Sequence, residues 1–310
     1  MSNLKRILLC GSSGMVGRNI KDSTPAKYEL LTPQSSELNL LNYGQTIQYL
    51  RQEHPGLIIH AAGIVGGIQA NIANPVKFLT ENTDMGRNLL LAAQNAGVTK
   101  LLNLGSSCMY PRQAPNPLKE ESILDGELEP TNEGYAIAKI FTQRLCTYIN
   151  KENPGFSYKT IIPCNLYGKY DDFSPEKSHM IPAVIRKIHE TKKRYNNTVE
   201  IWGDGKARRE FMYAGDLVRM MWEYIDRFDQ MPNLMNIGLG YDYTINEYYQ
   251  TIADVVGFSG SFSHNLSKPV GMKQKLVDTG KQKQVGLNPH YTLKQGIEAT
   301  YQYFLSTENQ

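Results

Sequence analysis

The chain has 310 residues, of which 41% are hydrophobic and 20% charged, and its net charge is +3. This composition is typical of a globular protein with a sizeable core, long enough for one large domain or two smaller ones. The near balance of 33 basic against 30 acidic residues argues against a nucleic-acid-binding protein. The short apolar segment near the N-terminus predicts neither a signal peptide nor a membrane span.

The four cysteines are scattered along the chain, with neither a paired spacing nor the spacing of metal ligands: Cys10, Cys108, Cys146 and Cys164. We therefore expect no zinc site and no disulfide framework, and the reducing cytoplasm is the expected compartment.

A short apolar run at 7–10 leads directly into the sequence GSSGMVG at 11–17. Glycines at this spacing allow a sharp turn, close approach to a pyrophosphate and tight packing of a helix on a strand. The spacing alone also occurs by chance in loops, but its place after an N-terminal strand favours dinucleotide binding. The predicted cofactor loop is Gly11, Ser12, Ser13, Gly14, Met15, Val16 and Gly17.

The end of the second predicted strand bears on the choice of cofactor. NAD sites usually place an acidic residue there, whereas residues 31–36 read LTPQSS and the first acid is Glu37. This favours NADP(H), although no arginine follows the strand. Ser12, Ser13 and Arg18 are candidate phosphate partners.

Strands and helices alternate along the first part of the chain, for example with a helical pattern at 82–96. This alternation predicts a Rossmann-type doubly wound parallel sheet of the α/β class, with ligands at the carboxyl ends of the strands. The further predicted strands are 28–31, 57–62, 101–104, 158–164 and 233–237.

The segment NEGYAIAK at 132–139 places Tyr135 and Lys139 four residues apart, and hence on one face of a helix. A surface pair is the ordinary interpretation of this spacing. Ser106, however, leaves the preceding predicted strand, and its hydroxyl could bind a carbonyl oxygen beside the tyrosine. A nearby ammonium is expected to lower the pKa of Tyr135. Ser106, Tyr135 and Lys139 then predict a carbonyl-reduction site, in which the tyrosine supplies a proton.

The segment LGSSCMYP at 104–111 raises the question of Cys108. A free cysteine is usually a small core residue, but it can exchange protons if its thiol faces a site. His179, by the same reasoning, is either a surface or capping residue or a second proton-exchanging group. The residues alone leave both questions open.

The second half changes character after about residue 167, with a polar loop at 169–178, a helix at 181–190 and a strand at 198–202. We expect a smaller C-terminal α/β substrate domain over the site. The predicted division gives 1–166 and about 216–238 to an NADP-binding domain, and about 167–215 and 239–310 to a substrate domain.

Several longer segments make the chain resemble the GDP-L-fucose synthases among the extended short-chain dehydrogenase/reductases. The segments are AAGIVGGIQAN (61–71), LGSSCMYP (104–111), LEPTNEGYAIAK (128–139), PCNLYG (163–168), SHMIPAVIRK (178–187) and IWGDGKARREFMY (201–213). The resemblance implies NADPH-dependent reduction at C4 of a GDP-4-keto-6-deoxy sugar, with epimerisation at C3 and C5 in the same site.

The resemblance also implies roles for individual residues. Cys108 and His179 match the acid and base of the epimerisation, and a homodimer through helices such as 82–96 and 134–149 is implied. Cofactor contacts extend to Ala61, Ala62 and Gly63. The implied substrate residues are Ser107, Asn165, Lys187, Trp202, Arg209 and Lys275, with Trp202 stacking on guanine and Lys187, Arg209 and Lys275 facing the diphosphate.

This chain departs from the family pattern at Gly134, where proline is common, and at Lys187, where arginine is common. It also lacks the basic residue that some members carry beside Ser12-Ser13. These departures leave the sugar open, so a GDP-4-keto-heptose is an alternative to the hexose in surface-polysaccharide biosynthesis.

Three other functions are alternatives to the bifunctional one. A C4 reductase without epimerisation fits the same residues. A catalytically silent dinucleotide-binding sensor is disfavoured by the intact Ser106, Tyr135 and Lys139. A 4,6-dehydratase is disfavoured because Ser107-Cys108 stands where an acidic pair is needed.

Overall fold

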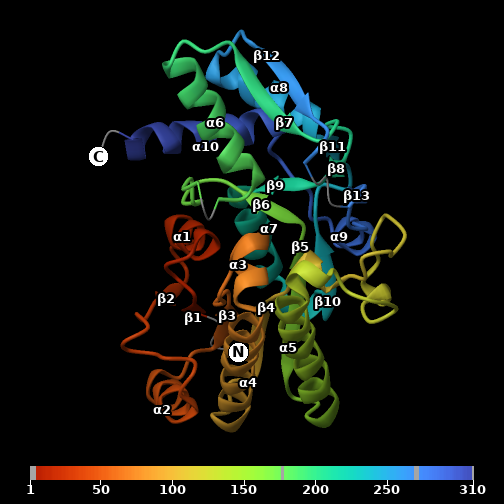
Figure 1. The fold of residues 1–310 in the computed structure, drawn as a ribbon. Coiled ribbons are helices and arrows are strands. Elements are labelled where there is room, and N and C mark those ends of the chain that lie inside the picture. The colour runs from red at the N-terminus through yellow and green to blue at the C-terminus, as the bar shows by residue number, and fades with distance from the viewer. Residues whose placement is uncertain (1–4, 176–177, 269–271, 309–310) are drawn as a thin grey trace.

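Six parallel strands form the main sheet of the computed structural model, which describes residues 5–175, 178–268 and 272–308 (Figure 1). The order across the sheet is β10-β5-β4-β3-β1-β2. Apolar side chains on both faces of these strands are buried, as a sheet covered by helices on both sides requires. The predicted α/β doubly wound fold is confirmed. Its strands are β1 (Arg6–Cys10), β2 (Glu29–Leu31), β3 (Leu57–His60), β4 (Lys100–Leu104), β5 (Ser157–Pro163) and β10 (Leu234–Ile237).

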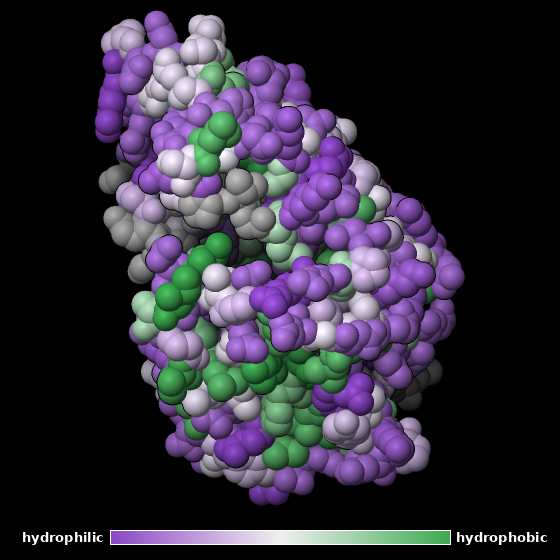
Figure 2. All heavy atoms as spheres, turned by 45° about the vertical axis from the view of Figure 1, so that its right-hand side comes forward, coloured by the Kyte–Doolittle hydropathy of each residue, from purple (hydrophilic) through white to green (hydrophobic). Residues whose placement is uncertain are grey.

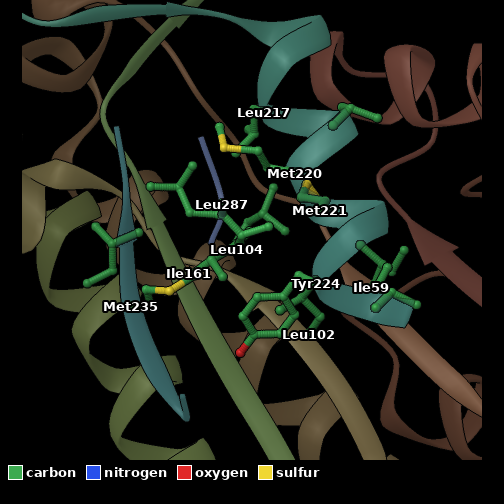
Figure 3. Close-up of a cluster of buried hydrophobic side chains, with 14 of the residues drawn as sticks. Ile59, Leu102, Leu104, Ile161, Leu217, Met220, Met221, Tyr224, Met235 and Leu287 are labelled. Atoms are coloured by element: carbon green, nitrogen blue, oxygen red, sulfur yellow. The ribbon is translucent and has the colours of Figure 1, made fainter. Parts of the chain in front are cut away.

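Helices cover the two faces of this sheet. One face packs against α2 (Tyr43–Glu53), α4 (Pro75–Asn95) and α5 (Glu133–Glu152). The other packs against α1 (Met15–Asp22) and α7 (Ala214–Asp226), and Figure 3 shows methionine and leucine side chains of α7 meeting β4 and β5 there. These helices cover the faces of the sheet, and the C-terminal lobe lies beyond the carboxyl ends of its strands (Figure 1).

Small residues let α4 and α5 approach each other closely. A Cβ on Gly86 of α4 would lie 2.3 Å from Oγ1 of Thr142 on α5. A Cβ on Gly134 would lie 3.0 Å from the carbonyl oxygen of Pro75 and 3.3 Å from Cβ of Leu79. Gly134, the departure from the family pattern, thus stands where the start of α5 crosses the start of α4.

A separate hydrophobic cluster fills the C-terminal lobe, with side chains from 167–211 and 248–304. We propose that it is the core of the substrate domain, while Val277 and Leu287 pack into the core of the main sheet instead. The lobe contains α6 (Met180–Lys193), α8 (Ile245–Val256), α10 (Leu293–Glu308) and the parallel pair β7 (Thr198–Trp202) and β12 (Ser261–Asn265).

Short elements connect the two lobes near the carboxyl ends of the main strands. β6 (Asn165–Tyr167) pairs with β9 (Phe211–Tyr213), and β8 (Arg208–Arg209) lies between β11 (Tyr243–Thr244) and β13 (Gln274–Lys275). The remaining helices are α3 (Ile68–Ala73), α9 (Gly280–Gln284) and 3-10 turns at Ser107–Met109, Glu120–Ser122, Pro130–Asn132 and Phe228–Gln230.

The predicted elements differ from the observed ones mainly at their ends. The helix expected at 82–96 begins earlier, at Pro75, because proline is well suited to a first helical turn. The strand expected at 57–62 ends at His60, where the chain turns toward the glycine loop. Within the described part of the chain, no helix is long and apolar enough to span a bilayer.

Candidate active site

The glycine loop after β1 meets the loop after β3 at the edge of the site. Gly11 has φ +87°, and a Cβ there would lie 2.5 Å from the amide nitrogen of Ala62. A Cβ on Gly17 would lie 2.0 Å from the carbonyl oxygen of Gly11. Both positions therefore require glycine. Gly11 and Ala61-Ala62, which the sequence assigned to one cofactor site, are in contact.

The start of α1 has the features of a site for a dinucleotide diphosphate. Gly14 is its N-cap, no side chain caps the helix, and a Cβ on Gly14 would meet only the carbonyl oxygen of Gly11 at 3.7 Å. Uncapped N–H groups at a helix N-terminus attract phosphate. At the end of β2, the Glu37 carboxylate accepts from the amide of Gln34 at 2.6 Å. This bond holds the Glu37 carboxylate against the loop that follows β2.

Gly63, in the loop that follows β3, lies close to Lys139. A Cβ on Gly63 would lie 3.7 Å from Nζ of Lys139 and 3.1 Å from Oδ1 of Asn82. The Asn82 side chain accepts from the amide of Ile64 at 2.8 Å and so fixes this loop. Asn82 was missed from the sequence, since an asparagine inside a helical pattern gives no signal of such a role.

Ser106, Tyr135 and Lys139 lie together at the carboxyl end of β4. Nζ of Lys139 donates to the carbonyl oxygen of Leu104 at 3.0 Å and is 5.7 Å from the centroid of the Tyr135 ring. Burial raises the pKa of Tyr135 well above its usual value, Cys108 adds to the rise, and a hydrogen bond with Ser106 opposes it. The prediction that Lys139 lowers this pKa is therefore wrong for the chain alone. A protonated tyrosine is in the form needed to donate a proton.

Burial of the charged Lys139 side chain destabilises the folded state. Burial lowers its pKa to about 8, and Cys108 acts in the opposite direction. At neutral pH the Lys139 ammonium is charged in both the folded and the unfolded chain. The folded state therefore carries the full free-energy cost of burying this charge. The penalty falls as pH rises from about 8 to the unfolded value of 10.5.

We expect Lys139→Met to raise the free energy of unfolding at pH 7 by up to about 3 kcal/mol, because the variant removes this buried charge. Urea unfolding at pH 7 and pH 9.5 measures the gain, which should shrink at the higher pH. Lys159→Met is the matched control. Burial lowers the pKa of Lys159 too, but Lys159 donates to two carbonyl oxygens, of Phe228 and Met231 at 2.7 and 2.5 Å, whereas Lys139 donates to one. Lys159→Met should therefore gain less stability than Lys139→Met. A Lys139→Met variant that is less stable than the wild type at pH 7 contradicts the prediction.

Cys108 lies in the 3-10 turn that follows β4, and its side chain is buried. Its amide donates to Oγ of Ser106 at 3.4 Å. Burial raises the pKa of the thiol, while Lys275, a hydrogen bond with Ser106 and Lys139 lower it. The cysteine is therefore buried like a core residue, but it lies among the polar groups of the site.

His179 is the N-cap residue of α6 and is exposed. The surrounding protein removes enough water to lower its pKa, and Asp172 acts in the opposite direction. Among the described residues, Asp172 is the charge that acts on this histidine. The structure thus places His179 on a different element from Cys108, without a hydrogen bond between them.

Two cations stand side by side where the lobes meet. Arg209 of β8 is in register with Lys275 of β13, and burial lowers the pKa of both. Arg209 donates to the carbonyl oxygen of Arg208 at 2.7 Å. Neighbouring half-buried cations are suited to an anion such as a diphosphate.

Glu210, beside Arg209, holds this junction together and was missed from the sequence. Its buried carboxylate accepts from the amides of Leu239, Gly240 and Val277 at 2.6, 2.9 and 2.9 Å. Because Val277 follows Lys275 by two residues, the carboxylate fixes the backbone of both cation-bearing strands. The signal in the sequence that could have indicated Glu210 is the position of an acidic residue between Arg209 and the apolar Phe211.

The other predicted substrate residues lie around this junction. Asn165 donates to the carbonyl oxygen of Glu210 at 3.2 Å, and Ser107 is buried beside Cys108. Trp202 is 55% exposed and donates to Oε1 of Glu200 at 3.1 Å. Lys187 donates to the carbonyl oxygen of Glu200, so it belongs with Trp202 and not with Arg209. The described residues contain no cluster of acidic, histidine or cysteine side chains able to hold a metal ion.

Comparison with known proteins gives a consistent picture. The pattern of the NAD dependent epimerase/dehydratase family matches residues 7–238. The chain is 55% identical to GDP-L-colitose synthase of Yersinia pseudotuberculosis, over 98% of this chain and 99% of that protein. It is 45% identical to a GDP-L-fucose synthase of Azorhizobium caulinodans, over 99% and 98%. The solved GDP-mannoheptose C4 reductase of Campylobacter jejuni, with NADP bound, superposes with a TM-score of 0.88 at 28% identity, over 98% of this chain and 99% of that one.

Proposed function

Because the chain belongs to the NAD dependent epimerase/dehydratase family, and within it to the GDP-L-fucose synthase-like proteins, we propose that it reduces the C4 ketone of a GDP-linked sugar with NADPH. The observation that carries the proposal is the meeting of Ser106, Tyr135 and Lys139 beside the glycine loop. We further propose that the sugar is a 4-keto-6-deoxy hexose and that the same site epimerises it at C3 and C5.

The proposed reduction uses three side chains of the site. NADPH, when bound, supplies a hydride to the carbonyl carbon. The Ser106 hydroxyl donates a hydrogen bond to the ketone oxygen, and Tyr135 gives that oxygen its phenolic proton. Lys139 holds the ribose of the cofactor and places positive charge near the phenolate that forms. Gly11 to Gly17 and Ala61 to Gly63 bind the rest of the cofactor.

The proposed epimerisation moves protons at carbons next to the ketone. The carbonyl acidifies the C–H bonds at C3 and C5, so a base on one side of the ring and an acid on the other suffice. We assign these parts to Cys108 and His179. Arg209 and Lys275 bind the diphosphate, with Asn165 and Ser107 nearby. Trp202 stacks on the guanine base, and Lys187, which shares Glu200 with it, lies on that side of the nucleotide.

Two alternatives differ in the sugar and in the epimerisation. The similarity to a GDP-mannoheptose C4 reductase supports a reductase that acts without epimerisation on a GDP-4-keto-hexose or GDP-4-keto-heptose. The similarity to a GDP-L-colitose synthase supports a 3-deoxy substrate, because colitose is fucose without its 3-hydroxyl. Such a sugar has no stereocentre at C3, which leaves C5 alone to epimerise.

One experiment separates these functions. Purified protein is incubated in deuterated water with NADPH and either GDP-4-keto-6-deoxy-mannose, its 3-deoxy form or a GDP-4-keto-heptose, and each product is analysed by mass spectrometry. NADPH oxidation with solvent deuterium at C3 and C5 supports the bifunctional enzyme, and oxidation without ring deuterium supports the pure reductase. No oxidation with any of the three sugars contradicts a C4 reductase.

The pH dependence of deuterium exchange tests which group is the base. With Cys108 as the base, exchange into the substrate should rise by roughly tenfold per pH unit from pH 6 to 8, since the raised pKa leaves little thiolate at neutral pH. A neutral His179 base predicts a profile that levels off at neutral pH and stays flat up to pH 8, because its pKa lies below the usual 6.5. Exchange with bound NADP⁺, followed by mass spectrometry, measures the rate without hydride transfer.

A homodimer through α4 and α5 is the assembly that we propose. Val76, Ile137 and Phe141 on these helices expose 72%, 42% and 37% of their surface. Figure 2 shows hydrophobic side chains gathered on the lower half of the molecule, where Figure 1 places α4 and α5. Exposed apolar patches of this kind support protein–protein contact.

We expect Phe141→Glu to shift the protein from dimer to monomer in analytical ultracentrifugation, because each copy would place a buried charge in the contact. Leu41→Glu is the control, since Leu41 is 45% exposed and lies outside α4 and α5. A wild-type monomer, or a dimer that survives the Phe141 change, contradicts the proposed interface.

The cellular role that we propose is synthesis of a GDP-sugar for capsule or lipopolysaccharide in the cytoplasm. All four cysteines are free and buried thiols, which supports a reducing compartment. The predicted partners are the GDP-linked keto sugar and a second copy of the chain, with no nucleic acid and no membrane.

A further inference from the structure

The loop that follows β6 lies between α1, the helix that begins at the glycine loop, and α10, the last helix of the chain, and it contacts both. It leaves Tyr167 and runs between α1 and α10, as Figure 1 shows for the green segment above α1. The same loop leads to His179 at the start of α6. A contact that fixes this loop therefore affects where the histidine stands.

Two consecutive residues of the loop bind three residues of α1. The hydroxyl of Tyr170 donates to Oδ2 of Asp22 at 2.7 Å, and Nζ of Lys169 is 2.5 Å from the same oxygen. Asn19 donates from its side-chain amide to the carbonyl oxygen of Lys169 at 2.9 Å. The guanidinium of Arg18 lies over the Tyr170 ring, 3.8 Å from its centroid. Hydrogen bonds, an ion pair and a cation–π contact thus converge on one short segment.

The opposite side of the loop packs against α10. The rings of Tyr170 and Tyr303 meet edge to face with centroids 5.1 Å apart. Phe173 continues the contact, with its ring centroid 4.9 Å from that of Phe304. Tyr170 is therefore held between the two lobes.

Tyr170 adopts a backbone conformation that residues with a Cβ disfavour. Its φ is +72°, in the left-handed region. Such a conformation persists where the surrounding contacts determine it more strongly than the backbone preference does. The contacts with α1 and α10 hold Tyr170 in this conformation.

Local hydrogen bonds join residues that lie between Tyr170 and His179 in the chain. The amide of Asp172 donates to Oδ1 of Asp171 at 2.9 Å, and the amide of Ser174 donates to Oδ1 of Asp172 at 2.7 Å. The amide of Ser178 donates to the carbonyl oxygen of Ser174 at 3.1 Å. These bonds order the described residues 171–174 and tie Ser178, the residue before the histidine, to Ser174.

We propose that Tyr170, held by Arg18, Asn19 and Asp22 of α1, is a positioning residue that sets the loop bearing His179 over the sugar. The inference rests on the proposed function, in which His179 exchanges a proton with the sugar ring. It ties the helix that carries the cofactor diphosphate to the group that acts on the substrate. Loss of the contact should impair proton exchange at the ring more than hydride transfer to C4.

Tyr170→Gly tests the proposal, because it removes the ring and hydroxyl while glycine accepts the positive φ. Tyr195→Gly is a matched control. Tyr195 also has a positive φ, of +55°, and is 94% exposed at the end of α6. Tyr170→Phe keeps the ring contacts and removes only the hydrogen bond to Asp22.

The first readout is amide hydrogen exchange of the segment 168–175, which needs no substrate. We expect exchange in this segment to be at least about tenfold faster in Tyr170→Gly, as loss of a hydrogen bond to a charged group would give, and unchanged in Tyr195→Gly. The exchange rate of this segment in Tyr170→Phe should fall between the rates in the two glycine variants. Equal protection of this segment in Tyr170→Gly and the wild type overturns the proposal.

The second readout is the number of solvent deuterium atoms in the product per hydride transferred. We expect this ratio to fall in Tyr170→Gly and to stay at the wild-type value in Tyr195→Gly. A general loss of folding would lower both processes together, and an unchanged ratio with a loosened loop contradicts a positioning role. If the wild type oxidises no NADPH with any GDP-keto sugar, the proposed function fails, while the exchange measurement still decides whether Tyr170 holds the loop.

Discussion

Tyr135→Phe should lower kcat for reduction of the GDP-keto sugar by about 10²–10⁴-fold, the range of a lost general acid. In the proposed mechanism the ketone oxygen gains negative charge as hydride arrives at carbon, and Tyr135 protonates it. Burial raises the pKa of this tyrosine, so it is fully protonated at neutral pH and ready to donate. Stopped-flow measurement of NADPH absorbance gives the rate of the step directly.

The phenylalanine variant should fold like the wild type and bind the cofactor. Its ring keeps the edge-to-face contact with Phe78, whose centroid is 6.4 Å away. Tyr148→Phe is the control on the same helix, since Tyr148 is 49% exposed. Unchanged reduction by Tyr135→Phe, with Tyr148→Phe also unchanged, would remove Tyr135 from the mechanism and favour a silent dinucleotide-binding protein.

Local spacing predicted the features that depend on one segment. The glycine pattern predicted the loop after β1, where Gly11 and Gly17 have no room for a Cβ. The four-residue spacing of Tyr135 and Lys139 predicted that they share a helix face, and both lie near β4. These features follow from the geometry of a strand, a turn and a helix, which short sequences determine.

Features that join distant segments could not be predicted in this way. Lys275 acts on the pKa of Cys108, yet nothing in either local sequence pairs them. The carboxylate of Glu210 binds amides from two other segments, which no local pattern indicates. The direction of the Tyr135 pKa was predicted wrongly because burial, which depends on the whole site, is the largest cause that acts on it. The left-handed backbone of Tyr170 likewise depends on α1 and α10.

Cys108→Ala should remove solvent deuterium from the ring carbons of the product, lowering the exchange rate by about 10²–10⁴-fold. NADPH oxidation should continue, because Ser106, Tyr135 and Lys139 remain in place. The product should then keep the configuration of the substrate at the ring carbons. Mass spectrometry of products formed in deuterated water, with NMR of the ring protons, measures both effects.

The control for this change is Cys146→Ala, which removes a second buried thiol, from the buried face of α5. Both variants lose packing of similar size, so a difference between them reports chemistry and not stability. If both retain full ring deuterium, Cys108 is a core residue and another group is the epimerisation partner of His179. If the wild type itself incorporates no solvent deuterium, Cys108 transfers no proton to or from the sugar ring. In that case the polar surroundings of Cys108 serve the reduction alone, and the chain is a C4 reductase.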